Sequence, residues 1–176
     1  MARNRSPLPQ NVNKNSQNLP KELFNLWRIP FNNEIEPSKL VAALRERIKE
    51  LNCLYGIAHL AERHSDSIED LLKDLVNFLP FSWQYPEITC AKIVFEGETY
   101  KSNGYKSSKW QQSARILRYN EPMGEVTISY LEERPPADEG PFLKEERALL
   151  DALAWRIGTT AMRISAELEY RRLTSS

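Results

Sequence analysis

Two long stretches of helical periodicity enclose a stretch of strand periodicity, and this order limits the fold more than any other feature. In the first stretch the apolar spacing is 3, 4, 3, 4 and 3, carried by Val41, Leu44, Ile48, Leu51, Tyr55 and Ala58. That heptad spacing is typical of a seam between two helices. A second apolar stripe lies on a neighbouring face: Leu40, Leu54, Ile57 and Ala61. Such a helix can pack on its own domain with one stripe and on a second copy of itself with the other. The alternative is that the two stripes form a single broad face that packs in the core.

The last helix is expected to begin at Pro141 and to run to about Arg172, roughly thirty residues or about 45 Å. Its stripe consists of Leu150, Leu153, Ile157, Ala161, Ile164 and Leu168. We predict a helical interface that takes residues from both long helices: Val41, Leu44, Ile48, Leu51, Tyr55, Leu153, Ile157 and Ile164. Leu51 and Leu153 are also expected to be buried.

The segment between the long helices predicts one short helix and a sheet. Ile68–Phe78 follows a serine cap and carries acidic residues in its first turn. Strands are expected at 88–95, 99–101, 114–119 and 123–131, separated by turn-forming residues. Antiparallel hairpins are the economical connection for such short strands. The predicted fold class is therefore α+β, a central antiparallel sheet flanked by long N- and C-terminal helices over residues 37–173.

Residues 1–36 differ in composition from the rest of the chain. They hold eight asparagines, four prolines and no glycine, and their net charge is +2 against −2 for the remainder. This is typical of a flexible arm. Within it the peptide 19–30 concentrates apolar residues, and Leu23, Phe24 and Trp27 are predicted to dock. Docking on a partner protein and packing back on the chain's own domain both remain open.

Composition argues against several classes of protein. Lysine plus arginine and aspartate plus glutamate both number 24, so the chain is not a uniformly basic nucleic-acid or membrane-surface binder. It contains no apolar run of the roughly 18–20 residues that a transmembrane helix needs, and its first ten residues lack the apolar region of a secretory signal. We expect a cytoplasmic protein that binds neither nucleic acid nor membrane.

Candidate catalytic residues are sparse. The two histidines, His59 and His64, lie five apart, and the two cysteines, Cys53 and Cys90, form no metal-ligand spacing. No phosphate loop, dinucleotide fingerprint or nucleophile elbow occurs. The paired carboxylates Glu132–Glu133 and Glu145–Glu146 are interpreted as solvated surface. We therefore expect no enzyme activity, no cofactor and no metal.

An aromatic cluster is the one candidate for a ligand site. Seven of the seventeen aromatic residues fall within residues 81–110. A core is the favoured interpretation, because aromatic side chains bury large areas. A small-molecule pocket is the alternative, with Ser107 or Gln111 nearby. Its candidate residues are Trp83, Tyr85, Cys90, Tyr105 and Trp110.

Four segments, in this order, resemble the GAF-like sensory modules of prokaryotic signalling proteins. They are Leu51-Asn-Cys-Leu-Tyr-Gly-Ile57, Trp83-Gln-Tyr-Pro-Glu87 with Cys90-Ala-Lys-Ile-Val94, Gly124-Glu-Val-Thr-Ile-Ser-Tyr-Leu-Glu132, and Gly140-Pro-Phe-Leu-Lys-Glu-Glu-Arg147. Such modules occur beside histidine kinases and phosphoenolpyruvate-utilising proteins. The resemblance covers roughly residues 42–170 and implies a GAF-like fold, with a PAS-like fold as the alternative. It does not specify a ligand.

The resemblance implies a regulatory module rather than a catalyst. No kinase, cyclase or DNA-binding unit follows in the printed sequence, so we expect it to modulate a protein partner, a kinase or an enzyme subunit. Dimerisation or docking through the terminal helices is the first hypothesis. A small accessory subunit of a phosphoenolpyruvate-utilising type of phosphotransferase is the alternative.

Overall fold

The computed structural model divides the chain into two units, Met1–Glu36 and Pro37–Ser176. It describes residues 39–175, all within the second unit. Two long helices are present here: α2, Lys39–Arg63, and α4, Lys144–Thr174. A third helix, α3, spans Ile68–Phe78, where it was predicted, and the Ser67 side chain accepts a hydrogen bond from the Asp70 amide as its N-cap.

The sheet is antiparallel and has four strands: β1, Thr89–Phe95; β2, Glu98–Lys101; β3, Trp110–Arg118; and β4, Glu121–Tyr130. Two short 3-10 turns, Leu79–Ser82 and Pro86–Ile88, lead from α3 into β1. The strand order is β2-β1-β4-β3, so both hairpins contribute an edge strand. The α+β class and the antiparallel sheet are confirmed.

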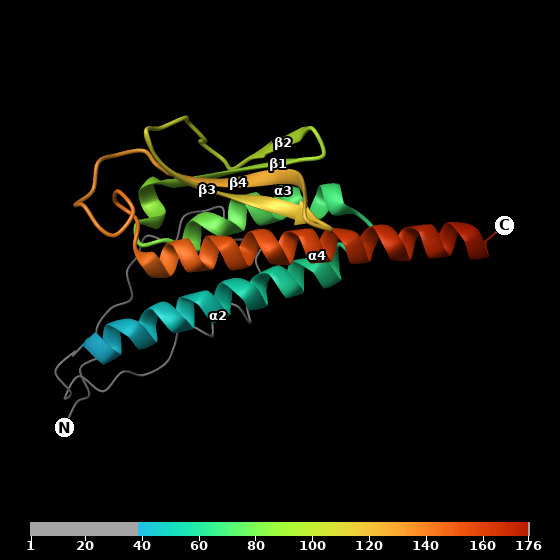
Figure 1. The fold of residues 1–176 in the computed structure, drawn as a ribbon, viewed down its shortest axis with the longest axis horizontal. Coiled ribbons are helices and arrows are strands. Elements are labelled where there is room, and N and C mark those ends of the chain that lie inside the picture. Colours follow the sequence, from blue (N-terminus) through green and yellow to red (C-terminus); the bar gives the residue numbers. More distant parts are fainter. Residues whose placement is uncertain (1–38, 176) are drawn as a thin grey trace, which may run out of the picture. The chain divides into compact units, whose positions relative to one another are not determined.

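The helices lie on one face of the sheet. Helix α3 contacts β1 and β2, whereas α4 contacts β3 and β4, so each helix covers one half of that face (Figure 1). Helix α4 approaches β3 closely at Gly158, where an added Cβ would lie 2.6 Å from the Leu117 carbonyl oxygen. A side chain at this position would push the helix off the sheet.

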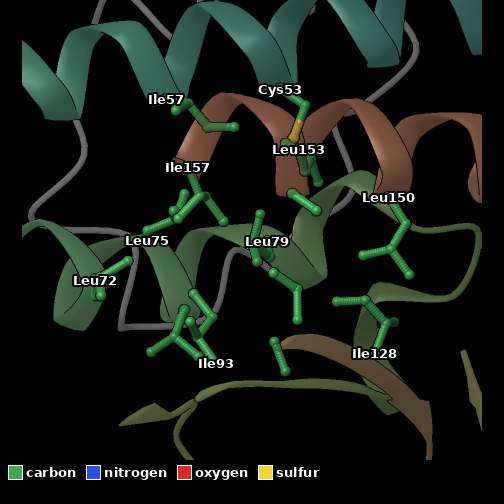
Figure 2. Packing of buried hydrophobic residues seen from close by; sticks show 14 of the residues in the cluster. Cys53, Ile57, Leu72, Leu75, Leu79, Ile93, Ile128, Leu150, Leu153 and Ile157 are labelled. Carbon is green, nitrogen blue, oxygen red and sulfur yellow. The ribbon is translucent and has the colours of Figure 1, made fainter. Parts of the chain in front are cut away.

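Helix α2 packs on the helices rather than on the sheet. Figure 2 shows Cys53 and Ile57 of α2 above Leu153 and Ile157 of α4, with Leu75 and Leu79 alongside and Ile93 and Ile128 of the sheet below. These side chains belong to one buried cluster. The core of the described residues therefore extends from the sheet through α3 and α4 to one face of α2.

Helix α4 begins three residues later than predicted. Glu139 and Phe142 form an isolated bridge that holds Pro141 and Phe142 in the preceding loop. The amide of Leu143 donates to the Glu146 carboxylate, 2.9 Å between nitrogen and Oε2, and this contact caps the helix. The cap, rather than the proline, sets the first residue of the helix.

Candidate functional site

Helix α2 carries two apolar faces that differ in exposure. The face toward α3 and α4 contains Cys53, Ile57, Leu60 and Ala61, all at most 2% exposed. The opposite face carries the heptad stripe. Leu44 is 50% exposed, and Leu51 and Tyr55 are each 53% exposed. We call Val41, Leu44, Ile48, Leu51, Tyr55 and Ala58 the outer face of α2.

The outer face is unusual for a helix of a single domain. Its large side chains recur at heptad spacing along more than four turns, so they form a continuous stripe instead of scattered exposed residues. A contiguous apolar patch on a surface indicates an interaction site. The prediction that Leu51 is buried was wrong, because the stripe around Ile57 and Ala61, on the opposite face of α2, packs in the core.

The predicted interface residues of α4 lie elsewhere. Leu153, Ile157 and Ile164 are at most 2% exposed and pack in the chain's own core. The structure therefore separates the eight predicted interface residues into two sets. Those on α4 are buried, whereas those on α2 are exposed, or partly buried in the case of Val41 and Ile48. The arm residues Leu23, Phe24 and Trp27 lie outside the described residues.

Helix α4 carries a second stripe that the sequence analysis missed. Its residues are spaced 4, 3, 4, 3 and 4, in the order Ala148, Ala152, Trp155, Thr159, Met162 and Ala166. Trp155 is 65% exposed. A tryptophan at heptad spacing was the available signal, but the leucine and isoleucine stripe of the same helix was stronger and was the one recognised.

A cavity of about 210 Å³ lies between the N-terminal parts of α2 and α4. Its charged lining includes Glu46, Arg47, Lys49, Glu50 and Glu145. The basic side chains are already paired within α2, Arg47 with Glu50 at 2.9 Å and Lys49 with Glu46 at 3.1 Å. The two ion pairs therefore neutralise the charges of the four α2 side chains that line the cavity.

Glu146 also lines this cavity, and it is 2% exposed. The interpretation of Glu146 as a solvated surface residue was wrong. Its carboxylate accepts hydrogen bonds from the Gln84 amide at 2.8 Å, the Leu143 amide at 2.9 Å and the Tyr130 hydroxyl at 3.2 Å. Burial raises the pKa of Glu146 above its ordinary value, while the two amides and the hydroxyl oppose that shift. One side chain thus connects α4 to β4 and to the bend at Gln84, between the two 3-10 turns.

Three residues of the predicted ligand pocket lie on the helix-covered side of the sheet. Trp83 is 1% exposed, and its indole nitrogen donates to the Gln112 side-chain oxygen at 2.8 Å. Tyr85 packs edge-on against Tyr130, with ring centroids 5.6 Å apart. Trp110 pairs with Tyr130 across the β3–β4 ladder and packs on the core. These three side chains are part of the core packing.

The other two residues, Cys90 and Tyr105, lie on the opposite side of the sheet. Cys90 pairs with Ser129 across the β1–β4 ladder, and its sulfur lies 3.6 Å from the Lys106 carbonyl oxygen. Burial raises the pKa of the Cys90 thiol. The Tyr105 ring lies near two ammonium groups, with Nζ of Lys101 5.5 Å and Nζ of Lys92 6.0 Å from its centroid. The sheet therefore divides the five predicted residues between its two faces.

Lys92 and Lys101 are direct partners in the β1–β2 ladder and point to the same side of the sheet. Like charges at such positions are destabilising. We predict that Lys101→Glu raises the free energy of unfolding by about 0.2–1 kcal/mol, because it replaces a repulsive cross-strand pair by an attractive one. Urea unfolding measures this change. Lys106→Glu, in the following loop, is the control with the same change in charge, and an equal gain in both variants would contradict the prediction.

Within the described part of the chain, no group of three or more histidine, cysteine, aspartate or glutamate residues is placed to hold a metal ion. No helix between residues 39 and 175 is both long and apolar enough to cross a membrane. Comparison of the chain with models of protein families, with curated proteins and with solved structures found no match.

Proposed function

We propose that the chain is a non-catalytic regulatory module that pairs with a second copy of itself through the outer face of α2. The observation that carries this proposal is the exposed heptad stripe around Leu44, Leu51 and Tyr55. A stripe of this kind is self-complementary, because two identical helices related by a twofold axis present the same residues to each other. The accessory-subunit hypothesis, which was based on the apolar peptide 19–30, remains a prediction.

The proposal retains the hypothesis of a GAF-like fold. It is supported by the α+β arrangement, in which a four-stranded antiparallel sheet carries its helices on one face, and by the four segments of resemblance. In such a module, the helical seam would have two arrangements, and a shift from one to the other would regulate the partner protein.

The pairing is expected to be modest in strength. The outer face runs from Val41 to Ala58, about 26 Å of helix at 1.5 Å per residue. That is about two and a half heptads, shorter than most stable two-stranded coiled coils. Its large side chains are half exposed in the single chain, so each has only part of its surface left to bury. An equilibrium between monomer and dimer suits a regulatory seam, because a small free-energy change can shift it.

Light scattering of the full chain over a range of concentrations tests this proposal. We expect the mass to rise toward that of a dimer and the double variant Leu44→Glu/Leu51→Glu to stay monomeric, since four carboxylates would meet in the seam. Tyr119→Glu is the matched control, because Tyr119 is 79% exposed at the β3–β4 hairpin. Circular dichroism confirms that each variant folds. Equal dimerisation of the double variant would contradict the proposal.

A further inference from the structure

We infer that the face of the sheet away from the helices binds a small, doubly charged oxyanion of the phosphate class beside the loop 102–109. We call this face the open face, since α3 and α4 both contact the other one (Figure 1). The side chains that we assign to the site are Lys92, Lys101 and Ser129. The inference is independent of pairing through α2, because α2 lies on the helix-covered side of the sheet.

The strand ladders place polar side chains next to one another on the open face. One row crosses all four strands, in the order Lys101, Lys92, Thr127 and Ser113. The next row, two residues along the strands, consists of Cys90, Ser129 and Gln111. Alternate residues of a strand point to opposite faces, and Ile93 and Ile128 of the same strands lie in the core. The open face therefore presents ammonium, hydroxyl and amide groups where the other face presents apolar ones.

Lys92 and Lys101 bring two positive charges together without a counter-charge. Both Nζ atoms lie within 6.0 Å of the centroid of the Tyr105 ring. Neither forms an ion pair with a carboxylate of the described residues. Glu125, on the same face of β4, accepts instead from the Thr127 hydroxyl at 3.3 Å. Contact with an aromatic ring stabilises an ammonium group but leaves its charge in place, so a bound dianion would neutralise the pair.

The loop 102–109 adds positive charge and covers one end of the open face. It contains two lysines and no acidic residue. The Lys106 carbonyl oxygen lies 3.6 Å from the Cys90 sulfur, and the Ser108 hydroxyl donates to the Tyr130 carbonyl oxygen. The loop is thus fixed to both central strands, over the row that contains Cys90.

Ser129 lies in that covered row with an unused hydrogen-bonding group. Its side chain is 0% exposed, and its hydroxyl has no partner among the described residues. Cys90 is its ladder partner, and Lys92 follows two residues after Cys90 on the same face of β1. A buried hydroxyl without a partner is costly, and such groups are rare in folded proteins. An oxyanion held between the loop and the sheet would supply the missing acceptor.

The donors on the open face select the class of ligand. An ammonium group is a compact point charge that binds phosphate well, whereas a planar carboxylate is better matched by the fork of an arginine. Two separate ammonium groups and a hydroxyl suit a tetrahedral anion, whose oxygens point in several directions. Its two negative charges equal the two positive charges of Lys92 and Lys101.

Titration of the isotopically labelled full chain with inorganic phosphate, followed by NMR, tests the site. The titration is made at about pH 8, where most of the phosphate carries two charges. Sodium chloride at equal ionic strength is the control for screening. We expect saturable shifts in the amides of β1, β2 and the loop 102–109 with phosphate alone. Equal shifts with both salts, or saturation confined to other segments, would overturn the inference.

Two lysine variants test the charged groups. Lys92→Gln and Lys101→Gln should each raise the Kd for phosphate at least about tenfold, because each removes a charge-assisted contact. Lys144→Gln is the matched control, since Lys144 is an exposed lysine at the start of α4. Its Kd should stay within about twofold of that of the unaltered chain, because salt screens a distant charge. An unchanged Kd in both lysine variants would overturn the inference.

Ser129→Ala tests the buried hydroxyl and separates binding from folding. We expect the Kd for phosphate to rise about tenfold, because a donor to a charged oxygen is lost. The melting temperature without phosphate should stay the same or rise, since the hydroxyl has no partner in the free chain. A lower melting temperature with an unchanged Kd would overturn the assignment of Ser129 to the site.

Phenyl phosphate, titrated in the same way, separates two sources of the anion. Binding tighter than that of inorganic phosphate supports a phosphate ester whose organic part packs on Tyr105. Equal binding of the two compounds supports the free ion. Binding of neither would overturn the inference.

Discussion

Replacing Leu153 by alanine is expected to lower the free energy of unfolding by about 2–5 kcal/mol, as for other fully buried leucines. Leu153 is 0% exposed on α4 and lies beneath Cys53 of α2 (Figure 2). Truncation would leave a cavity where α2 packs on α4, and neighbouring side chains can close it only in part. Denaturant unfolding followed by circular dichroism measures the loss.

Leu51→Ala is the matched control, since it makes the same chemical change on the other long helix. Leu51 is 53% exposed, so its truncation removes few contacts within the core. We expect the free energy of unfolding to fall by less than about 1 kcal/mol. Similar losses in the two variants would mean that the outer face is as buried as the core.

Replacing Glu146 by alanine is expected to cost about 3–5 kcal/mol of unfolding free energy. Three donors lose their acceptor: the Gln84 amide, the Leu143 amide and the Tyr130 hydroxyl. Each is held by tertiary structure near a buried site, where an unpaired donor is costly. Thermal or denaturant unfolding measures the loss. A cost no larger than that of Glu145→Ala, an exposed neighbour on the same turn, would contradict the prediction.

The variant Glu146→Gln tests the ionisation of the same carboxyl. Burial raises the pKa of Glu146 from its ordinary value of 4.5, so the folded chain holds that proton more tightly than the unfolded chain does. The contribution of Glu146 to stability is therefore full below pH 4.5 and decreases as the pH rises through the raised pKa. The unaltered chain should therefore lose stability relative to Glu146→Gln between pH 4 and pH 7. A gain in stability relative to Glu146→Gln over that range would mean that the three donors outweigh burial.

Much of the secondary structure was predictable, because it depends on neighbours along the chain. Helix α3 has the predicted bounds, with Ser67 as its cap, and all four strands lie within a few residues of their predicted positions. The largest error in a strand is at β3, which begins at Trp110 rather than at residue 114. Its polar start, Trp110-Gln-Gln-Ser, lacks the β-branched residues typical of strands. Pairing with Ile128, Ser129 and Tyr130 of β4 draws it into the sheet.

The candidate sites were less predictable, because each depends on contacts between distant segments. The two faces of the sheet divide the aromatic cluster, so Trp83 packs in the core and Tyr105 lies over two lysines. Glu146 resembles its exposed neighbour Glu145 in sequence, yet it is buried because Tyr130 and the Gln84 amide meet it there. The cap contact with the Leu143 amide is local, but the contacts with Gln84 and Tyr130 come from segments that only the tertiary structure brings to Glu146.

The apolar spacing predicts from the sequence alone that the first long helix has two apolar stripes, within residues 40–61, and that the last helix has one, within residues 150–168. Spacing is a property of the helix itself, at 3.6 residues per turn. Which stripe is buried depends on the whole domain, because α2 has one side against α3 and α4, and α4 has one side against the sheet. The packing places Ile57 and Leu153 in the core and leaves Leu51 and Trp155 exposed. The candidate interaction surface is therefore the outer face of α2, which the packing of the domain leaves outside the core.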